Sequence, residues 1–351
     1  MSTAGLHILV PGPIEQRTGG YIYDARIVQG LRDRGWDVRI HSLPGEFPLP
    51  ENDAFVRVLA SIPDGSCVVL DGLTLAATPE AIVFHRSRLR IIALVHHPLS
   101  DETGLSSDMR ELLMRLERQA LRAVSGVVVT SRFTADTLKR FGVSPARIRV
   151  VEPGVDKVGF AEGPGLNEPP ELLVVGAVIP RKGHDVLIRA LSSLRHHAWH
   201  CVCAGSVERN RSYAKLVMGS VERNDLVGRI EFVGECDSSE LDDYYRRASV
   251  FVLPSHYEGY GMVLAEALVR GLPIISTTGG AISDTVPAET GALVPPGNSD
   301  ALSGAIRSFI DGSDGVTTRT RCKQAARRYA VTMASWESAV IQMENAVAEL
   351  A

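Results

Sequence analysis

Two glutamates, Glu258 and Glu266, flank a glycine-containing turn in the segment EGYGMVLAEAL. Because Gly259 and Gly261 disfavour a continuous helix, we expect a helix to begin only near Met262, after the apolar strand SVFVLP. The N–H groups of its first turn would then be free to bind a phosphate. Ionised carboxylates only accept hydrogen bonds, so the two acids suit the hydroxyls of one extended sugar-containing ligand.

Two other interpretations of these acids compete. A helix cap at Glu258 and a solvated Glu266 would be purely structural, but Glu266 lies among Ala265, Ala267 and Leu268, where a solvated acid is less natural. A glycosidase acid/base pair would flank one scissile bond, with the carboxyl groups roughly 5 to 9 Å apart. Here both acids come from one loop–helix segment beneath a phosphate-type turn, so hydrolysis is the weaker hypothesis.

A pair of cations, Arg181 and Lys182, lies in the segment AVIPRKGH, just after the apolar strand ELLVVG. At the carboxyl end of that strand they would neutralise a diphosphate leaving group. A solvated basic loop is the structural alternative. The position favours the functional interpretation.

A glycine-rich turn, PGPIEQRTGG, ends at Gly19 and Gly20 and opens the first helix of the chain. Its spacing is not G-x-G-x-x-G, and the second strand ends in His41 and Ser42 rather than in an acid, so it is not a dinucleotide fingerprint. The turn is either structural or a second source of backbone N–H groups for a phosphate.

Two adjacent histidines, His96 and His97, end the apolar run RIIALVHH. A single histidine is more often structural than catalytic, but an imidazole at the carboxyl end of a strand is well placed to contact a substrate. We therefore expect one of the two to contact the substrate.

The elements that must position these residues follow a regular order of apolar strand, turn and helix. This order is typical of parallel sheets covered on both faces. The stretch GFAEGPGLNEPP, residues 159–170, interrupts it as a linker does. We expect two doubly wound domains, 1–160 and 161–334, with a helix at about 335–351 that could pack back on the first. Ligands bind outside the carboxyl ends of such strands, so the site is expected in a cleft between the domains.

Composition and charge exclude several classes of protein. The 351 residues are 45% hydrophobic and carry a net charge of −4, which is ordinary for a globular protein and does not indicate nucleic-acid binding. No apolar run approaches the ~18 residues of a spanning helix, and the N-terminus lacks the basic region of a signal peptide. The arginines of the segment 109–124 alternate with acids, which favours a solvated face over peripheral membrane contact. Five cysteines without a Cys-x-x-Cys pair disfavour a metal site and favour the cytoplasm.

The sequence resembles the family-four retaining glycosyltransferases of the GT-B fold, from the Gly19-Gly20 turn to Trp336. The most specific likeness is the E-x7-E motif in the setting VLPSHYEGYGMVLAEALVRGLPIISTTGG, and VVEPGVDKVGF, TSRFTADTL and PRKGHDVLIRAL support it. The resemblance implies an α/β fold of two Rossmann-like domains. It also implies transfer of a hexose-type sugar from a nucleotide diphosphate sugar to an acceptor hydroxyl, with retention and without a cofactor.

The chemistry implied is independent of a metal, because the sequence has no Asp-x-Asp, the usual metal–diphosphate signature of the other major glycosyltransferase fold. No side chain is an evident nucleophile, so front-face attack is expected, with the departing phosphate taking the acceptor proton. The protein would hold the geometry and stabilise the charge that grows on the diphosphate.

The resemblance further implies roles for individual residues. Glu266 would hold the nucleotide ribose and Glu258 the transferred sugar, with His96 beside that sugar. Two cations would bind the diphosphate, and backbone groups of three segments would contact the donor. The cations are Arg181 and Lys182, and the segments are Gly19 with Gly20, Val233 with Gly234 near the base, and the run Gly259, Tyr260, Gly261, Met262 and Val263.

One position departs from the family pattern. Many relatives have Gly-Arg where this chain has Gly176-Ala177, so Arg181 would have to replace the missing cation. The departure keeps open a non-catalytic protein that binds sugar nucleotides. Another activity of the same fold, that of a phosphorylase or an epimerase, is a further alternative. The motifs are shared by enzymes with different donors and do not select a sugar, a base or an acceptor.

Overall fold

The computed structural model describes residues 5–164 and 168–350, and the chain divides into two compact units. Unit 1 comprises Met1–Gly154 together with Ala334–Ala351, and unit 2 comprises Val155–Met333. The first unit therefore ends six residues before the boundary expected at residue 160. Part of the expected linker, residues 165–167, lies outside the described residues.

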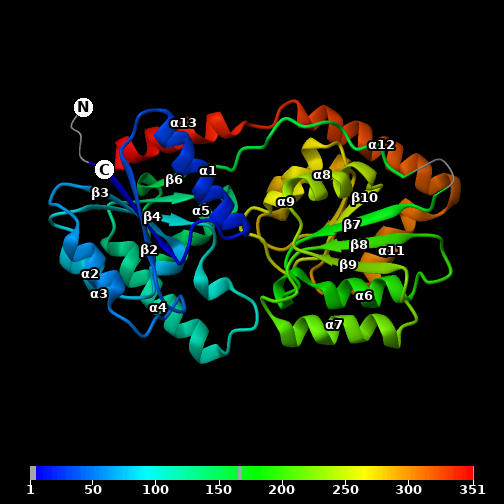
Figure 1. Ribbon diagram of the computed structural model, residues 1–351, viewed down its shortest axis with the longest axis horizontal. Coiled ribbons are helices and arrows are strands. Elements are labelled where there is room, and N and C mark those ends of the chain that lie inside the picture. Colours follow the sequence, from blue (N-terminus) through cyan, green and yellow to red (C-terminus); the bar gives the residue numbers. More distant parts are fainter. Residues whose placement is uncertain (1–4, 165–167, 351) are drawn as a thin grey trace. The chain divides into compact units, whose positions relative to one another are not determined.

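Unit 1 is built on a six-stranded parallel sheet (Figure 1). Its strands lie in the order β2-β1-β3-β4-β5-β6, so the order reverses between β1 and β3. These strands coincide with the apolar runs of the first half of the sequence. They are β1 (Leu6–Pro11), β2 (Val38–Leu43), β3 (Cys67–Asp71), β4 (Arg90–Val95), β5 (Gly126–Val129) and β6 (Ile148–Val150).

Helices cover both faces of this sheet. On one face, α2 (Ala54–Ser61), α3 (Pro79–His85) and α4 (Ser107–Ala123) enclose a core in which Phe55, Leu121 and Val127 are fully buried. The chain then continues from β5 into the short helix α5 (Arg132–Thr137).

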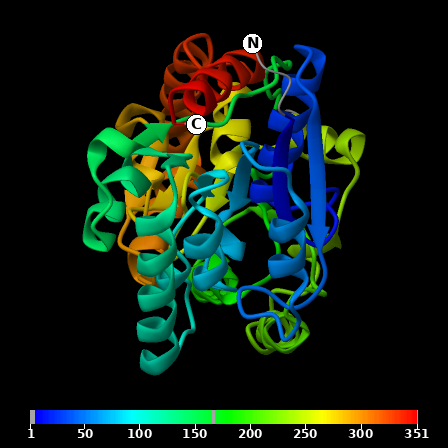
Figure 2. The same cartoon turned by 90° about the vertical axis from the view of Figure 1, so that its left-hand side faces the viewer.

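The opposite face is covered by α1 (Gly19–Asp33) and the C-terminal helix α13 (Trp336–Leu350), which lie side by side (Figures 1 and 2). Gly30 of α1 permits this close approach, because a Cβ there would lie 2.3 Å from a methyl group of Val340. The last helix thus packs on the first unit, although all of unit 2, Val155–Met333, separates it in sequence from the rest of that unit.

Unit 2 contains a second parallel sheet, in the order β12-β11-β10-β7-β8-β9. Counted from the first strand of the unit, this is the 3-2-1-4-5-6 order of the Rossmann fold, with its switch point between β7 and β10. The strands are β7 (Glu171–Val175), β8 (His200–Ala204), β9 (Ile230–Gly234), β10 (Val250–Leu253), β11 (Ile274–Thr277) and β12 (Gly291–Val294).

Residues alternate between the two faces of this sheet, as the period of a strand requires. Leu172 and Val174 enter the core on the first face, whereas Leu173 and Val175 enter the core on the second face. The predicted fold class, two Rossmann-like α/β units, is confirmed. The helices of the first face are α6 (His184–Ser192), α7 (Arg211–Arg223) and α11 (Ser299–Ile310); those of the second are α8 (Ser238–Arg247), α9 (Met262–Val269), α10 (Ile282–Thr285) and α12 (Gly312–Ala330).

Within the described ranges, no helix combines the length and the hydropathy needed to cross a bilayer.

Candidate functional site

The switch point of unit 2 brings two of the predicted motifs together. Arg181 and Lys182 lie in a short 3-10 helix, Pro180–Lys182, that follows β7, and Glu258 lies in the loop after β10. Because β7 and β10 are neighbouring parallel strands, their following loops meet at the same edge of the sheet. Ligands of doubly wound sheets bind at this position.

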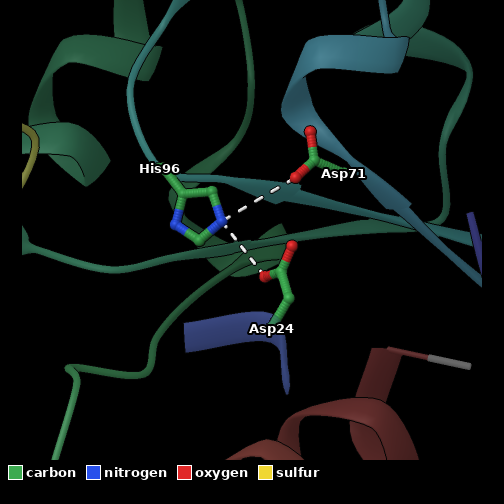
Figure 3. A group of neighbouring side chains, drawn as sticks. All are labelled: Asp24, Asp71 and His96. Carbon is green, nitrogen blue, oxygen red and sulfur yellow. Dashed lines mark hydrogen bonds and ion pairs between the residues drawn. The ribbon is translucent and has the colours of Figure 1, made fainter. Parts of the chain in front are cut away.

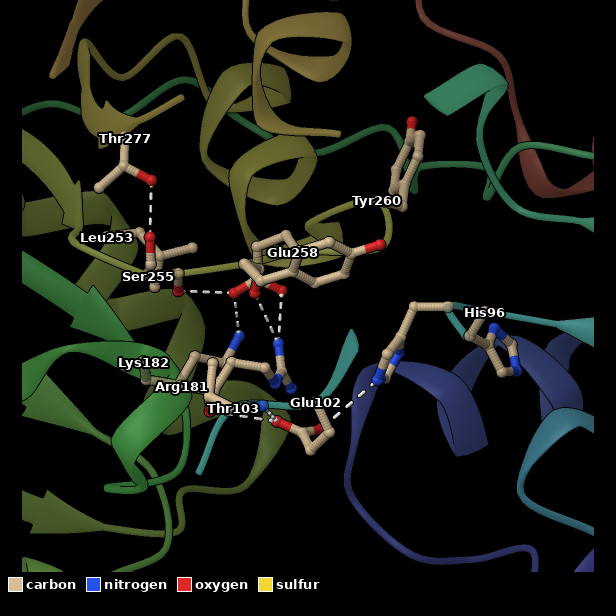
Figure 4. Close-up of polar contacts among 12 residues, drawn as sticks. His96, Glu102, Thr103, Arg181, Lys182, Leu253, Ser255, Glu258, Tyr260 and Thr277 are labelled. Atoms are coloured by element: carbon tan, nitrogen blue, oxygen red, sulfur yellow. Dashed lines mark hydrogen bonds and ion pairs between the residues drawn. The ribbon is translucent and has the colours of Figure 1, made fainter. Parts of the chain in front are cut away.

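Glu258 is buried and holds both cations (Figure 4). Its Oε1 lies 2.8 Å from Lys182 Nζ, and its Oε2 lies 3.2 Å from Arg181 Nη1. Ser255 Oγ donates a 2.6 Å hydrogen bond to Oε1. Burial alone would raise the pKa of this carboxyl, but Lys182 and Arg181 lower it to about 2, so Glu258 is ionised at neutral pH.

This cluster combines two positive charges with one negative charge, which leaves a net charge of +1. The side chains of Arg181 and Lys182 are 17% and 12% exposed, so both cations are largely withdrawn from water and their orientations are set by Glu258. Charges fixed in this way act on an anion more strongly than solvated ones, because little solvent or side-chain rearrangement is needed. The arrangement therefore suits the binding of a diphosphate.

Close backbone approaches hold the loop after β10 in place. Gly280 (φ 65°) pairs with Glu258, and a Cβ at Gly280 would lie 2.2 Å from the Glu258 carbonyl oxygen. Gly183 (φ 69°) approaches the Pro254 carbonyl equally closely, and His256 N donates to the Arg181 carbonyl at 2.8 Å. These glycines are required because any side chain would collide with a peptide group.

The helix after this loop begins where the glycines predict. Gly261 has φ 88° and precedes α9, whose first residue is Met262. The segment from Gly259 to Val263 therefore forms the turn and the first turn of α9, with Tyr260 between the two glycines. The Thr285 hydroxyl donates to the Tyr260 carbonyl at 2.6 Å and ties the turn to α10.

Glu266 lies further along α9 and has partners of its own. Tyr245 of α8 donates a 3.0 Å hydrogen bond to Glu266 Oε2, and Arg270 donates to its carbonyl oxygen at 3.0 Å. Burial raises the pKa of the Glu266 carboxyl, and the Tyr245 hydrogen bond partly offsets this effect. Glu266 is partly buried and anchored, unlike a solvated surface acid.

Val233 and Gly234, expected near the base, end strand β9. Gly234 has φ 77°, and its carbonyl accepts a 2.7 Å hydrogen bond from Gly205 N. They lie at the same edge of the sheet as the cation cluster but two strands away from β7.

The predicted residues of unit 1 also assemble at the ends of their strands. Gly19 and Gly20 are the first residues of α1, and His96 directly follows β4. A Cβ on Gly20 would lie 3.2 Å from the His96 ring, so the glycine allows the helix to approach the imidazole. His97 instead lies 3.4 Å from the carboxylate of Glu102.

Several polar residues that contact the predicted ones were not anticipated. Ser255 and Tyr245 hold the two glutamates, and Asp24 and Asp71 lie beside His96. Asp71 ends an apolar strand in the stretch SCVVLDG, which is a position typical of functional acids and was the available signal. The others lie within helices or loops without a comparable pattern.

Two family models match the chain. The model described as Glycosyltransferase Family 4 matches residues 69–157, and the model described as Glycosyl transferases group 1 matches residues 160–329. The chain belongs to glycosyltransferase family 4.

One curated relative of this chain is the D-inositol 3-phosphate glycosyltransferase of Kineococcus radiotolerans. It is 29% identical over 239 residues, which make up 60% of this chain and 54% of the relative. The chain thus spans about half the length of this curated relative.

Solved structures resemble the family 4 chain over nearly its whole length. The sucrose-phosphate synthase of Thermosynechococcus elongatus has a TM-score of 0.80 at 22% identity and matches 97% of each chain. Anabaena HepE in complex with UDP and glucose has a TM-score of 0.77 at 16% identity, over 98% of this chain and 99% of that one. At these identities the likeness establishes the fold alone, and it agrees with the GT-B fold predicted from the sequence.

Proposed function

We propose that this chain transfers a hexose-type sugar from a nucleotide diphosphate sugar to an acceptor hydroxyl, with retention of configuration and without a metal ion. The observation that carries the proposal is the buried cluster of Glu258, Arg181 and Lys182 at the switch point of unit 2. Family membership and the structure of HepE with UDP and glucose support the same class of donor.

In this proposal, charge accumulates on the diphosphate as the glycosidic bond breaks. Lys182 and Arg181 stabilise that charge, and the N–H groups at the start of α9 stabilise it further. The departing phosphate oxygen accepts the proton of the attacking hydroxyl, so no side chain is needed as nucleophile. The reaction depends on positioning and electrostatics.

The two glutamates bind different hydroxyl groups of the donor. Glu266, held by Tyr245, accepts hydrogen bonds from the ribose, and Glu258 accepts one from the transferred sugar while it orients the cations. His96 contacts the sugar from unit 1. Arg181 replaces the cation that many relatives carry at the position of Ala177.

The test is a panel of nucleotide sugars with the whole 351-residue chain. UDP-, GDP- and ADP-sugars are incubated with candidate acceptors, and the release of nucleoside diphosphate is followed in EDTA and with added magnesium or manganese. We expect release in EDTA, with an axial product linkage by NMR if the donor is an α-glucosyl nucleotide. Activity that stops in chelator and returns with metal would contradict the metal-free mechanism.

The same panel separates the alternative of a non-catalytic sugar-nucleotide-binding protein, which the departure at Ala177 keeps open. Such a protein would show a thermal shift with a nucleotide sugar and no release of nucleoside diphosphate with any acceptor. We expect both the shift and the release.

A further inference from the structure

Two buried acids lie against the imidazole of His96 in unit 1 (Figure 3). Asp24 comes from α1 and Asp71 from the end of β3, and their side chains are 1% and 4% exposed. His96 Nε2 lies 3.1 Å from Asp24 Oδ1 and 4.0 Å from Asp71 Oδ2. One edge of the imidazole therefore faces both acids.

The two acids have too few hydrogen-bond donors for both to be ionised. Asp71 Oδ1 accepts a 2.7 Å hydrogen bond from Leu73 N, but the buried Asp24 Oδ2 accepts none from the N–H and O–H groups of the described residues. This free oxygen points toward Asp71 in Figure 3. A proton on Asp71 supplies the missing donor, and burial followed by the charge of Asp24 raises the pKa of Asp71 to about 8.

The protonation state of the imidazole depends on the acids beside it. Burial would lower the pKa of His96, but the charge of Asp24 and the hydrogen bond with it raise that pKa above its ordinary value. A further titratable group against the ring is Tyr23 of α1, whose ring meets the imidazole edge to face with the two ring centroids 5.4 Å apart. With Asp24 ionised and Asp71 neutral, a protonated His96 leaves the whole group uncharged.

The other nitrogen of His96 is available to a ligand. Nε2 is directed at the acids, and in the described part of the chain no side chain or backbone group forms a hydrogen bond with Nδ1. The side chain is 21% exposed, although α1 and the strand ends surround it.

We propose that Asp24 and Asp71 are positioning residues that share one proton, orient His96 and hold it as an imidazolium whose Nδ1–H donates to an oxygen of the substrate. This inference deepens the proposed function, because it gives His96 a fixed charge and a fixed donor direction. Asp24 supplies the negative charge. Asp71 acts as a neutral hydrogen-bond donor to Asp24.

The first test measures the pKa of His96 by NMR in the whole 351-residue chain with labelled histidine side chains, and the His96 signal is assigned through His96→Gln. Asp24→Asn should increase the acid dissociation constant of His96 at least about tenfold, because the adjacent negative charge is lost. Asp71→Asn should change it little, because an amide replaces a neutral acid. Asp33→Asn, at an exposed position of the same helix, is the matched control.

The outcomes separate the possible arrangements. Equal effects of Asp24→Asn and Asp71→Asn would overturn the assignment of the shared proton to Asp71, and no effect of Asp24→Asn would overturn the whole proposal. One equivalent of divalent metal per chain that disappears in Asp24→Asn would also overturn it. If Asp24→Asn does not fold, Asp24→Glu keeps the carboxylate and should retain the raised pKa of His96.

The second test uses the pH dependence of kcat/KM with the active donor. The imidazolium is present below its pKa, so activity should fall as pH rises through that value. Asp24→Asn should move this alkaline limb to lower pH, which a merely structural role would not do, and Asp33→Asn should leave it in place. An unmoved limb in Asp24→Asn would overturn the proposal. The NMR measurement needs no substrate. It therefore tests the arrangement of Asp24, Asp71 and His96 even if the proposed sugar transfer is not observed.

Discussion

At the scale of single residues, one carboxylate organises the candidate site. Glu258 is ionised and ion-paired with two cations that sequence analysis placed at the diphosphate. The sequence predicts each of the three residues separately. Their mutual pairing follows from the neighbouring positions of β7 and β10, which the sequence does not state.

Lys182 is the residue on which transition-state stabilisation should depend most. We expect Lys182→Ala to lower kcat about a hundredfold or more, the loss seen when one preorganised charge-stabilising group is removed. Steady-state kinetics on the full chain measure this effect. Lys215→Ala, on the exposed face of α7, is the control for loss of a lysine, and near-normal turnover of Lys182→Ala would contradict the mechanism.

The two glutamates should differ in what they bind. Glu266→Ala should weaken nucleoside diphosphate binding by about 1.5 to 3 kcal/mol, because the ribose loses a charged acceptor. Glu258→Ala should reduce turnover more than it reduces nucleoside diphosphate affinity. Isothermal titration calorimetry with nucleoside diphosphate, beside turnover, makes the comparison, and equal losses of affinity in both variants would contradict this division.

Glu258 should also support the folded state. Its removal leaves two buried cations without their shared carboxylate, a change that costs about 3 to 5 kcal/mol. The folded-state pKa of about 2 lies below the ordinary 4.5, so this contribution is present above pH 4.5 and is lost as pH falls toward 2. Glu258→Gln should therefore show a lower Tm than wild type at pH 7. That difference should shrink in acid, and an equal difference at pH 7 and pH 3 would contradict the assignment.

At the scale of elements, the loops after the strands are specified by glycines as much as by charged residues. The backbone of Glu258 lies so close to Gly280 that no side chain would fit there, and the backbone of Pro254 lies equally close to Gly183. Both glycines have positive φ. The TTGG stretch therefore contributes to the site through its backbone.

Replacing Gly280 should disturb the site without changing any charged group. We expect Gly280→Ala to lower both the Tm and kcat, because its Cβ would overlap the Glu258 carbonyl and its φ of 65° disfavours alanine. Thermal unfolding and kinetics measure the two effects. Gly304→Ala in α11 is the matched control, since a Cβ there meets open space and should leave stability unchanged or increase it by up to about 1 kcal/mol. A Gly280→Ala protein as stable and active as wild type would contradict this role.

Strands were more predictable than helices. Each described strand of the two six-stranded sheets coincides with a strand expected from the sequence. The inner strands are apolar along most of their length because both of their faces are covered, whereas the edge strand β2 carries exposed polar residues. Helices such as α8 were not anticipated from the sequence. The buried Tyr245 of that helix and the partly buried Leu241 and Tyr244 form only a short apolar stripe among charged residues, which is a weak signal for a helix. Its capping box at Asp237 was the available signal.

At the scale of the whole molecule, the two units should respond differently to a nucleotide. We expect nucleoside diphosphate to slow amide exchange in unit 2, in the segments 176–182 and 255–266, because the cation cluster and the start of α9 lie there. Hydrogen–deuterium exchange of the full chain measures this. A matched incubation with the nucleoside alone, which lacks the diphosphate, should give weaker protection of 176–182. Protection confined to unit 1 would reverse the assignment of the donor-binding unit.

The unit on which the C-terminal helix packs could not be predicted from the order of elements along the chain. The apolar spacing of the last residues predicts a helix near residues 335–351, but either unit could have received it. It packs on the first unit, where Gly30 leaves room for Val340 beside α1 and Gly126 leaves room for Leu350, since a Cβ at either glycine would overlap these side chains. Complementary surfaces across distant parts of the chain cannot be read from local periodicity.

The sequence by itself determined the fold class and the strands, and it placed the candidate site residues at strand ends, because apolar runs, glycines and charged groups act over a few residues. Only the tertiary structure decided the order of the strands, and therefore which loops meet. It paired Glu258 with Arg181 and Lys182, Glu266 with Tyr245, and His96 with Asp24 and Asp71. These pairs join residues between 21 and 77 positions apart in the sequence. The protonation states of their side chains depend on burial, which exists only once the sheets and helices have packed.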